Sequence, residues 1–112
     1  MSNADNVTDL VAMARNGTDA QKEQAVAALV GGVASNPANR DAVLVSGGIG
    51  VLVALARDGT DAQKEHAAAA LANCATFNPA NRDAVNEAGG IGVLVGLARD
   101  GTDAQKDRKS VV

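Results

Sequence analysis

An eight-residue stretch is written three times in this chain at a fixed interval, and this constrains the fold more than any other feature. The copies are NGTDAQKE from Asn16, DGTDAQKE from Asp58 and DGTDAQKD from Asp100, so successive copies begin 42 residues apart. The segments NPANRDAV and GGIGVLV each recur at the same spacing. A fixed period of about 40 to 47 residues is typical of helical units that stack on their own copies. The sequence therefore predicts a tandem array of one structural unit.

The repeated stretch itself predicts a helix end followed at once by a helix start. We expect Gly59 to adopt the left-handed conformation that closes the preceding helix. Thr60 is then an N-cap, and Gln63 three residues later completes a capping box, in which each side chain accepts the other residue's free backbone N–H. The same pair recurs as Thr18 with Gln21 and as Thr102 with Gln105.

Apolar spacing and turn residues divide one period into a short, a middle and a long helix. In NPANRDAV, Asn78 is placed to cap the short helix and Pro79 occupies its first position, where a missing N–H costs nothing. The glycine pair Gly89-Gly90 ends it. The middle helix has an apolar stripe of Ile91, Leu94, Val95 and Ala98. The long helix runs to about Thr76, with stripes of Ala67, Leu71, Cys74 and Ala75 in one copy and Val26, Leu29, Val30 and Val33 in the other.

Composition and charge exclude several classes of protein. The 112 residues include 46% apolar residues but only one aromatic, and 10 basic and 13 acidic residues alternate without a basic block that would indicate nucleic-acid binding. The single cysteine excludes an internal disulfide, and the first residues lack the pattern of a secretory signal. The longest apolar run is about half of what a membrane span needs. We expect an intracellular protein, cytoplasmic or nuclear, that does not act at a membrane.

No arrangement of residues predicts catalysis, a metal or a cofactor. The GGIG segments lack both the third glycine of a dinucleotide fingerprint and the Gly-Lys-Ser/Thr of a phosphate loop. His66 and Cys74 are the only residues of their kinds, and they lie roughly 12 Å apart along one predicted helix. Cys74 is interpreted as a small buried residue. The repeated Arg-Asp pairs, such as Arg40-Asp41, favour salt bridges or caps between units. The chain is predicted not to be an enzyme.

The helix order, the period and the string NEAGGIGVLVGLARDGTDAQK together resemble the armadillo repeat, and AVNEAGGIGVLVGLA and AALANCA fit that family's helices directly. The resemblance covers nearly the whole chain and implies an all-α, right-handed α-solenoid of about two and a half three-helix repeats. We expect one array over residues 1–112, with a partial repeat at 6–35, a full repeat at 36–77 and a partial repeat at 78–107. HEAT repeats are the alternative, but they usually have two helices per unit.

The resemblance also implies where a partner would bind, because armadillo proteins hold peptides or partner proteins along their third helices. The Asn of the family's binding pair falls on Asn73 and on Gly31, and its Trp falls on Ala69 and Ala27. Helical spacing adds further residues to this face. The candidate partner-binding residues are Glu23, Gln24, Ala27, Gly31, Glu65, His66, Ala69 and Asn73. The alternative is an ordinary solvated helix face.

These observations predict a non-enzymatic scaffold for protein–protein interaction, whose small-residue face flanked by two glutamates suits a basic extended segment. The partner is a protein or peptide, not nucleic acid. The alternative is a purely structural or truncated fragment that self-associates without a dedicated ligand. This alternative arises because DRKSVV replaces the expected continuation of the last long helix, so the apolar face of the helix from Ile91 to Ala98 lacks its usual cover and homo-oligomers could form.

Overall fold

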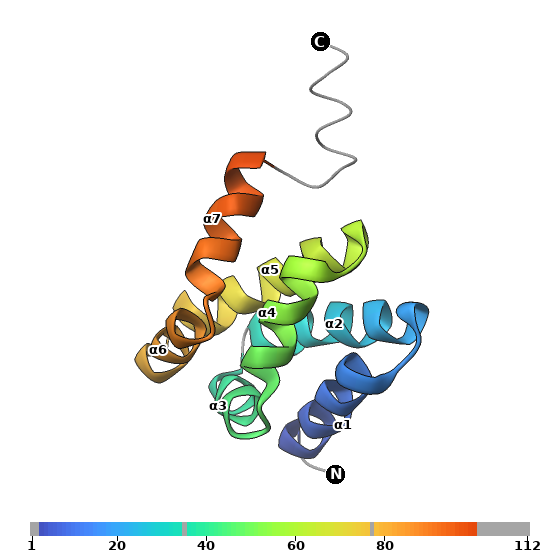
Figure 1. The fold of residues 1–112 in the computed structure, drawn as a ribbon. Helices are drawn as coiled ribbons and strands as arrows, with labels where there is room; N and C mark the ends of the chain where they lie inside the picture. Colours follow the sequence, from blue (N-terminus) through green and yellow to red (C-terminus); the bar gives the residue numbers. More distant parts are fainter. Residues whose placement is uncertain (1–2, 35, 77, 101–112) are drawn as a thin grey trace.

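The computed structural model describes residues 3–34, 36–76 and 78–100, and every regular element among them is a helix. The helices are α1 (Asn3–Asn16), α2 (Asp19–Ala34), α3 (Pro37–Val45), α4 (Gly48–Asp58), α5 (Asp61–Thr76), α6 (Pro79–Glu87) and α7 (Gly90–Asp100). In Figure 1, α4 lies across α5, and α2 lies beside α5. The predicted all-α class and the predicted order of short, middle and long helices are confirmed.

Capping boxes begin both described long helices, as the sequence predicts. In α5 the Thr60 N–H donates to Gln63 Oε1 at 3.0 Å, and the Gln63 N–H donates to Thr60 Oγ1 at 3.2 Å. Thr18 and Gln21 make the same two bonds at 2.9 and 3.2 Å. The third pair, Thr102 with Gln105, lies outside the described residues. Each box satisfies two backbone N–H groups that have no partner inside the helix.

The predicted left-handed conformation of Gly59 is wrong. Its backbone is extended, with φ −75° and ψ −177°. Glycine is needed there for space, because a Cβ would lie 2.5 Å from the Leu55 carbonyl oxygen and 2.7 Å from Gln63 Oε1. Gly17 is in the same situation, with the Met13 carbonyl oxygen 2.7 Å from a Cβ position. Gln63 and Gln21 fold back over their own caps, so the capping glutamine excludes a side chain at the preceding glycine.

Left-handed glycines occur instead at the corners between short and middle helices. Gly47 has φ +77° and Gly89 has φ +81°, and only these described residues have positive φ. The second glycine of each pair permits close packing, since a Cβ on Gly90 would lie 2.6 Å from Val85 Cγ1 and 3.0 Å from Val53 Cγ2. Each corner therefore uses its first glycine for conformation and its second for contact with the preceding repeat.

The short helices begin with the predicted asparagine caps. Asn36 Oδ1 accepts from the Ala38 N–H at 3.0 Å, and Asn78 Oδ1 accepts from the Asn81 N–H at 3.1 Å. Helix α3 also closes the end of α2, because Arg40 Nε donates to the Val33 carbonyl oxygen at 2.7 Å and Asn39 Nδ2 donates to that of Gly32 at 2.8 Å.

The repeated Arg-Asp pairs therefore act at Arg40 as a helix cap, one of the two predicted roles. The second copy differs. Arg82 is exposed, and Asn81 Nδ2 donates to the Arg40 carbonyl oxygen at 3.1 Å. Asp41 Oδ1 accepts from Asn78 Nδ2 at 2.7 Å. Its observed partner is therefore a side-chain amide, whereas a salt bridge between units was one of the two predicted roles of the Arg-Asp pairs. Asparagine side chains at the start of α6 thus donate to α3 at a backbone carbonyl oxygen and at a carboxylate oxygen.

The core forms where α2 and α5 pack on the middle helices. Of the predicted stripes, Ala67, Leu71, Cys74, Val26, Leu29 and Val33 are buried, whereas Ala75 and Val30 are half-buried. The stripe of α7 is different. Ile91 and Val95 are 42% and 56% exposed, although their counterparts in α4, Ile49 and Val53, are 4% and 2% exposed. Within the described residues, the apolar side chains Ile91 and Val95 of α7 are therefore exposed, as expected from the sequence.

Within the described residues, no single helix is long and apolar enough to cross a membrane. Helices α3 and α4 together have the length and apolar composition of a membrane span, but their axes are bent by 84° where they meet.

Candidate functional site

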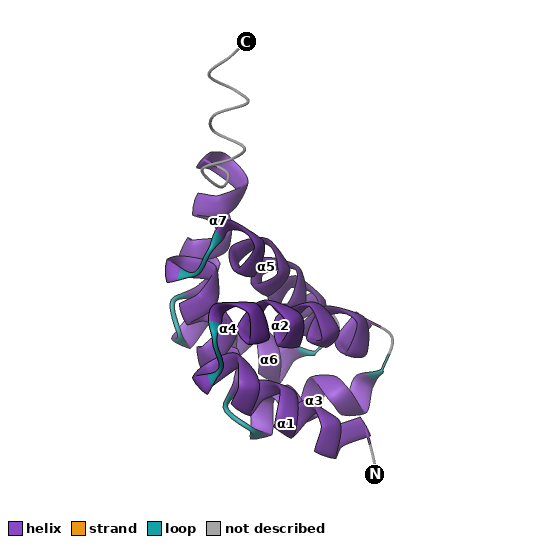
Figure 2. Cartoon of the chain, turned by 90° about the vertical axis from the view of Figure 1, so that its right-hand side faces the viewer, coloured by secondary structure: helices purple, strands orange, loops and turns teal. Residues whose placement is uncertain are grey.

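The predicted partner-binding residues all lie on the two long helices, α2 and α5, which pack side by side. Figure 2 shows these two helices adjacent to each other along the molecule. None of the eight side chains is buried. Glu23, Gln24, Ala27, Gly31 and Glu65 are exposed, and His66, Ala69 and Asn73 are half-buried.

The chemistry of this surface differs between its two helices. On α2, a Cβ added to Gly31 would meet no atom within 4 Å, so the backbone is open to solvent at the position equivalent to Asn73. On α5, Asn73 supplies one amide that could hydrogen-bond to a partner's backbone. Glu23 and Glu65 occupy equivalent positions one period apart and are both exposed. The surface thus has a glutamate near the start of each helix, followed by small residues on α2 and by Ala69 and Asn73 on α5.

Gln63 has a second role that the sequence prediction missed. Besides closing its own capping box, its Nε2 donates to the backbone carbonyl oxygen of Asp19 at 3.0 Å. Gln63 is 2% exposed, whereas Gln21, which makes only the box, is exposed. One glutamine therefore starts α5 and also joins it to the start of α2. The recurrence of this glutamine in every copy was the available signal, because a cap alone would tolerate glutamate equally well.

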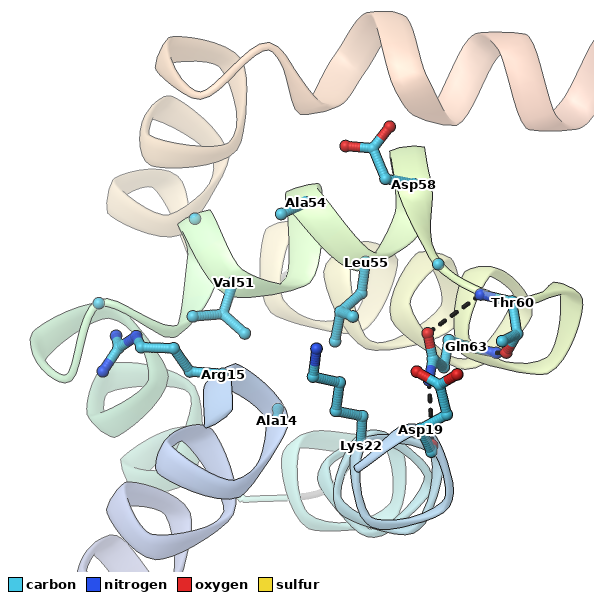
Figure 3. Close-up of a pocket in the computed structure, with 13 residues that line it drawn as sticks. Ala14, Arg15, Asp19, Lys22, Val51, Ala54, Leu55, Asp58, Thr60 and Gln63 are labelled. Atoms are coloured by element: carbon cyan, nitrogen blue, oxygen red, sulfur yellow. Dashed lines mark hydrogen bonds between the residues drawn. The ribbon is translucent and has the colours of Figure 1, made fainter. Parts of the chain in front are cut away.

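A groove between α1 and α4, at the two helix joints, was also not predicted. It has a volume of about 720 Å³. Its lining comprises Ala14, Arg15, Asp19, Lys22, Gly47, Gly50, Val51, Ala54, Leu55, Asp58, Gly59, Thr60 and Gln63, and none of these is a predicted partner-binding residue. In Figure 3 the Lys22 side chain points toward Leu55, whereas the Arg15 side chain extends toward the α3–α4 corner. The sequence signal was the recurrence of this arginine and lysine with the repeat.

Cys74 is a buried thiol, as predicted. It is 0% exposed, and burial raises its pKa from 9.0 to about 11, opposed by the nearby Arg40 charge. The thiol is therefore protonated at neutral pH and is a poor nucleophile. Among the described residues, no group of three or more His, Cys, Asp or Glu side chains could hold a metal ion.

Comparison with known families identifies the repeat. The family model of the Armadillo/beta-catenin-like repeat matches residues 36–76, which comprise α3, α4 and α5 with the cap of α3. No curated protein and no solved structure matches the chain. The predicted resemblance is thus confirmed over residues 36–76, which match the armadillo repeat, a fold of the protein-interaction scaffold kind.

Proposed function

Starting from an armadillo repeat over residues 36–76, we propose that the chain is a non-enzymatic scaffold that binds a basic, extended segment of a partner protein on α2 and α5. The proposal includes a right-handed solenoid of about two and a half repeats, because each long helix then stacks on the next and adds to one continuous surface. The observation that carries it is the accessibility of all eight candidate residues on two adjoining helices.

The charge preference comes from Glu23 and Glu65. Both are exposed and stand at equivalent positions of adjacent repeats, so a lysine- or arginine-containing segment lying across α2 and α5 could approach both. The small residues that follow them along the two helices, Ala27, Gly31 and Ala69, leave room for a backbone to come close. Asn73 then supplies one hydrogen bond to that backbone.

Titration with a basic peptide tests this proposal. A twelve-residue peptide of alternating Lys and Ala should shift backbone amide resonances at Glu23, Glu65, His66 and Asn73. Glu23→Gln with Glu65→Gln should weaken binding about three- to tenfold, since each exposed ion pair contributes only ~0.2–1 kcal/mol. Glu87→Gln, an exposed change on α6, serves as the charge control. Absence of shifts at millimolar peptide would exclude the proposal.

A second candidate function is self-association, and the exposed face of α7 favours it. Ile91 and Val95 lie one helical turn apart and are 42% and 56% exposed, so together they present an apolar strip. Sedimentation velocity should then reveal a dimer that Val95→Glu dissociates. Val45→Glu is the matched control, because Val45 is 86% exposed on α3. A monomer at the highest attainable concentration rules this candidate out.

A further inference from the structure

The groove between α1 and α4 has the size and lining of a binding site, and the scaffold surface on α2 and α5 does not use it. Its volume of about 720 Å³ falls within the range of roughly 300–1,000 Å³ that is usual for ligand sites. Ala14, Val51, Ala54 and Leu55 provide apolar surface. Gly50 also lines the groove, and a Cβ at this position would meet nothing within 4 Å, so there is open space for a side chain there.

Charges are distributed unevenly along this groove. In Figure 3, Arg15 lies by the α3–α4 corner and the Lys22 ammonium lies below Leu55. Asp19 lies at the other end, beside Gln63 and Thr60, and Asp58 points away from Leu55. The lining therefore has two cations, Arg15 and Lys22, and two carboxylates, Asp19 and Asp58. The end beside the corner therefore has the Arg15 cation and neither of the two carboxylates.

The arginine position recurs in the next repeat. The Arg15 Nη2 atom lies 3.4 Å from a Cβ position on Gly47, and Arg57 Nη2 lies 3.5 Å from the equivalent position on Gly89. One period after Lys22, Val51 and Leu55, the sequence again has Lys64, Val93 and Leu97. The cationic end of the groove is thus a repeated feature of the fold, placed against a left-handed glycine each time.

We infer that this groove binds an extended acidic segment of a partner protein, with one acidic side chain at Arg15, another at Lys22, and an apolar side chain between them against Val51 and Leu55. Charge complementarity selects the acidic residue, because Arg15 lies at one end of the apolar surface and Lys22 lies below Leu55, whereas Asp19 lies beyond Lys22 and Asp58 points away. The site shares no residue with the eight predicted partner-binding residues and has the opposite charge preference. The two sites can therefore be tested independently.

Fluorescence anisotropy with a labelled twelve-residue peptide of alternating Glu and Leu tests the inference. Arg15→Gln with Lys22→Gln should weaken binding about three- to tenfold, and raising the salt from 0.05 to 0.5 M should weaken it further. Gly50→Met should reduce binding at least tenfold by filling the groove, and the open space at this position lets the variant fold. Arg82→Gln, an exposed change on α6, is the control and should bind as the native chain does.

Three results would overturn the inference. The first is no binding of the Glu-Leu peptide at millimolar concentration. The second is equal or tighter binding of a Lys-Leu peptide. The third is binding that survives Gly50→Met and Arg15→Gln with Lys22→Gln but is lost in Glu23→Gln with Glu65→Gln, which would move the peptide to α2 and α5. Failure of the Lys-Ala peptide to bind bears only on the α2 and α5 surface.

Discussion

Helices α4 and α7 have nearly the same sequence but different neighbours in the fold. Their eleven residues differ at one position, Ala54 in α4 and Gly96 in α7. Yet Ile49 and Val53 are almost fully buried, whereas their counterparts Ile91 and Val95 are exposed. Val53 packs against the next repeat at Gly90, and within the described residues Val95 has no such neighbour. The burial of a residue in this fold is therefore set by the adjacent unit and not by its own helix.

Truncating the equivalent isoleucines should give the largest difference between the two helices. Ile49→Ala is expected to lower the free energy of unfolding by about 2–5 kcal/mol, because it removes buried methyl groups and leaves a cavity. Ile91→Ala should cost less than about 1 kcal/mol, since its side chain is already partly hydrated. Urea denaturation followed by circular dichroism measures both. Equal losses would mean that α7 is covered in solution.

Raising the pH is expected to destabilise α5, the helix that packs on α4, because α5 contains the buried Cys74 thiol. The pKa of Cys74 is about 11 in the folded protein against 9.0 for the ordinary thiol. Because the folded pKa is the higher one, the stabilisation is complete below pH 9 and is lost as pH rises toward 11. The loss should reach about 2–3 kcal/mol.

The cysteine-specific part of this loss is isolated by Cys74→Ala. Urea denaturation at pH 8, 9, 10 and 11 should show a steeper decline in the native chain than in the variant. Parallel curves would mean that the thiol ionises as readily in the folded chain as in the unfolded one.

The glutamines of the two capping boxes allow the same comparison, because Gln63 is buried and Gln21 is exposed. Gln63→Ala is expected to cost about 2 kcal/mol, because it opens the capping box and removes the partly buried bond from Gln63 to the Asp19 carbonyl oxygen. Gln21→Ala removes only an exposed box and should cost about 0.5 kcal/mol. Thermal unfolding of both variants provides the test. If the two losses match, the bond to Asp19 contributes nothing to stability.

Exchanging the one differing residue should have the smallest effect. Gly96→Ala makes α7 identical to α4 and should stabilise the chain by up to about 1 kcal/mol through helix propensity. A Cβ on Gly96 would meet no atom within 4 Å, so no clash opposes the gain. Ala54→Gly should lose a similar amount. A destabilised Gly96→Ala variant would indicate that something packs against this position in solution.

Features that depend on a few neighbouring residues could be predicted from the sequence. The capping boxes, the asparagine caps and the apolar stripes follow from spacing within one helix. The conformation of Gly59 could not be predicted, because glycine is selected both where the backbone is left-handed and where a Cβ has no space. At Gly59 the reason is lack of space beside Gln63, and the backbone is extended. The predicted surface on α2 and α5 is accessible, but what binds it stays a prediction.

Features that depend on contacts between repeats were missed. The bond from Gln63 to Asp19 and the groove beside Arg15 both require the relative placement of two units, which a single period does not contain. The two copies of NPANRDAV show the same limit, since Arg40 is buried and bonds to α2 while Arg82 is exposed. Identical letters therefore predicted identical helices but not identical contacts.

The bond between Gln63 and the Asp19 carbonyl also determines how disturbances pass along the array. It joins residues 44 apart in the chain, and its acceptor lies at the first turn of the preceding long helix. If the start of α2 frays, the Gln63 amide loses its acceptor while its oxygen still holds Thr60. The capping box at the start of α5 would then persist without its hydrogen bond to α2, so α2 can unfold while α5 stays folded.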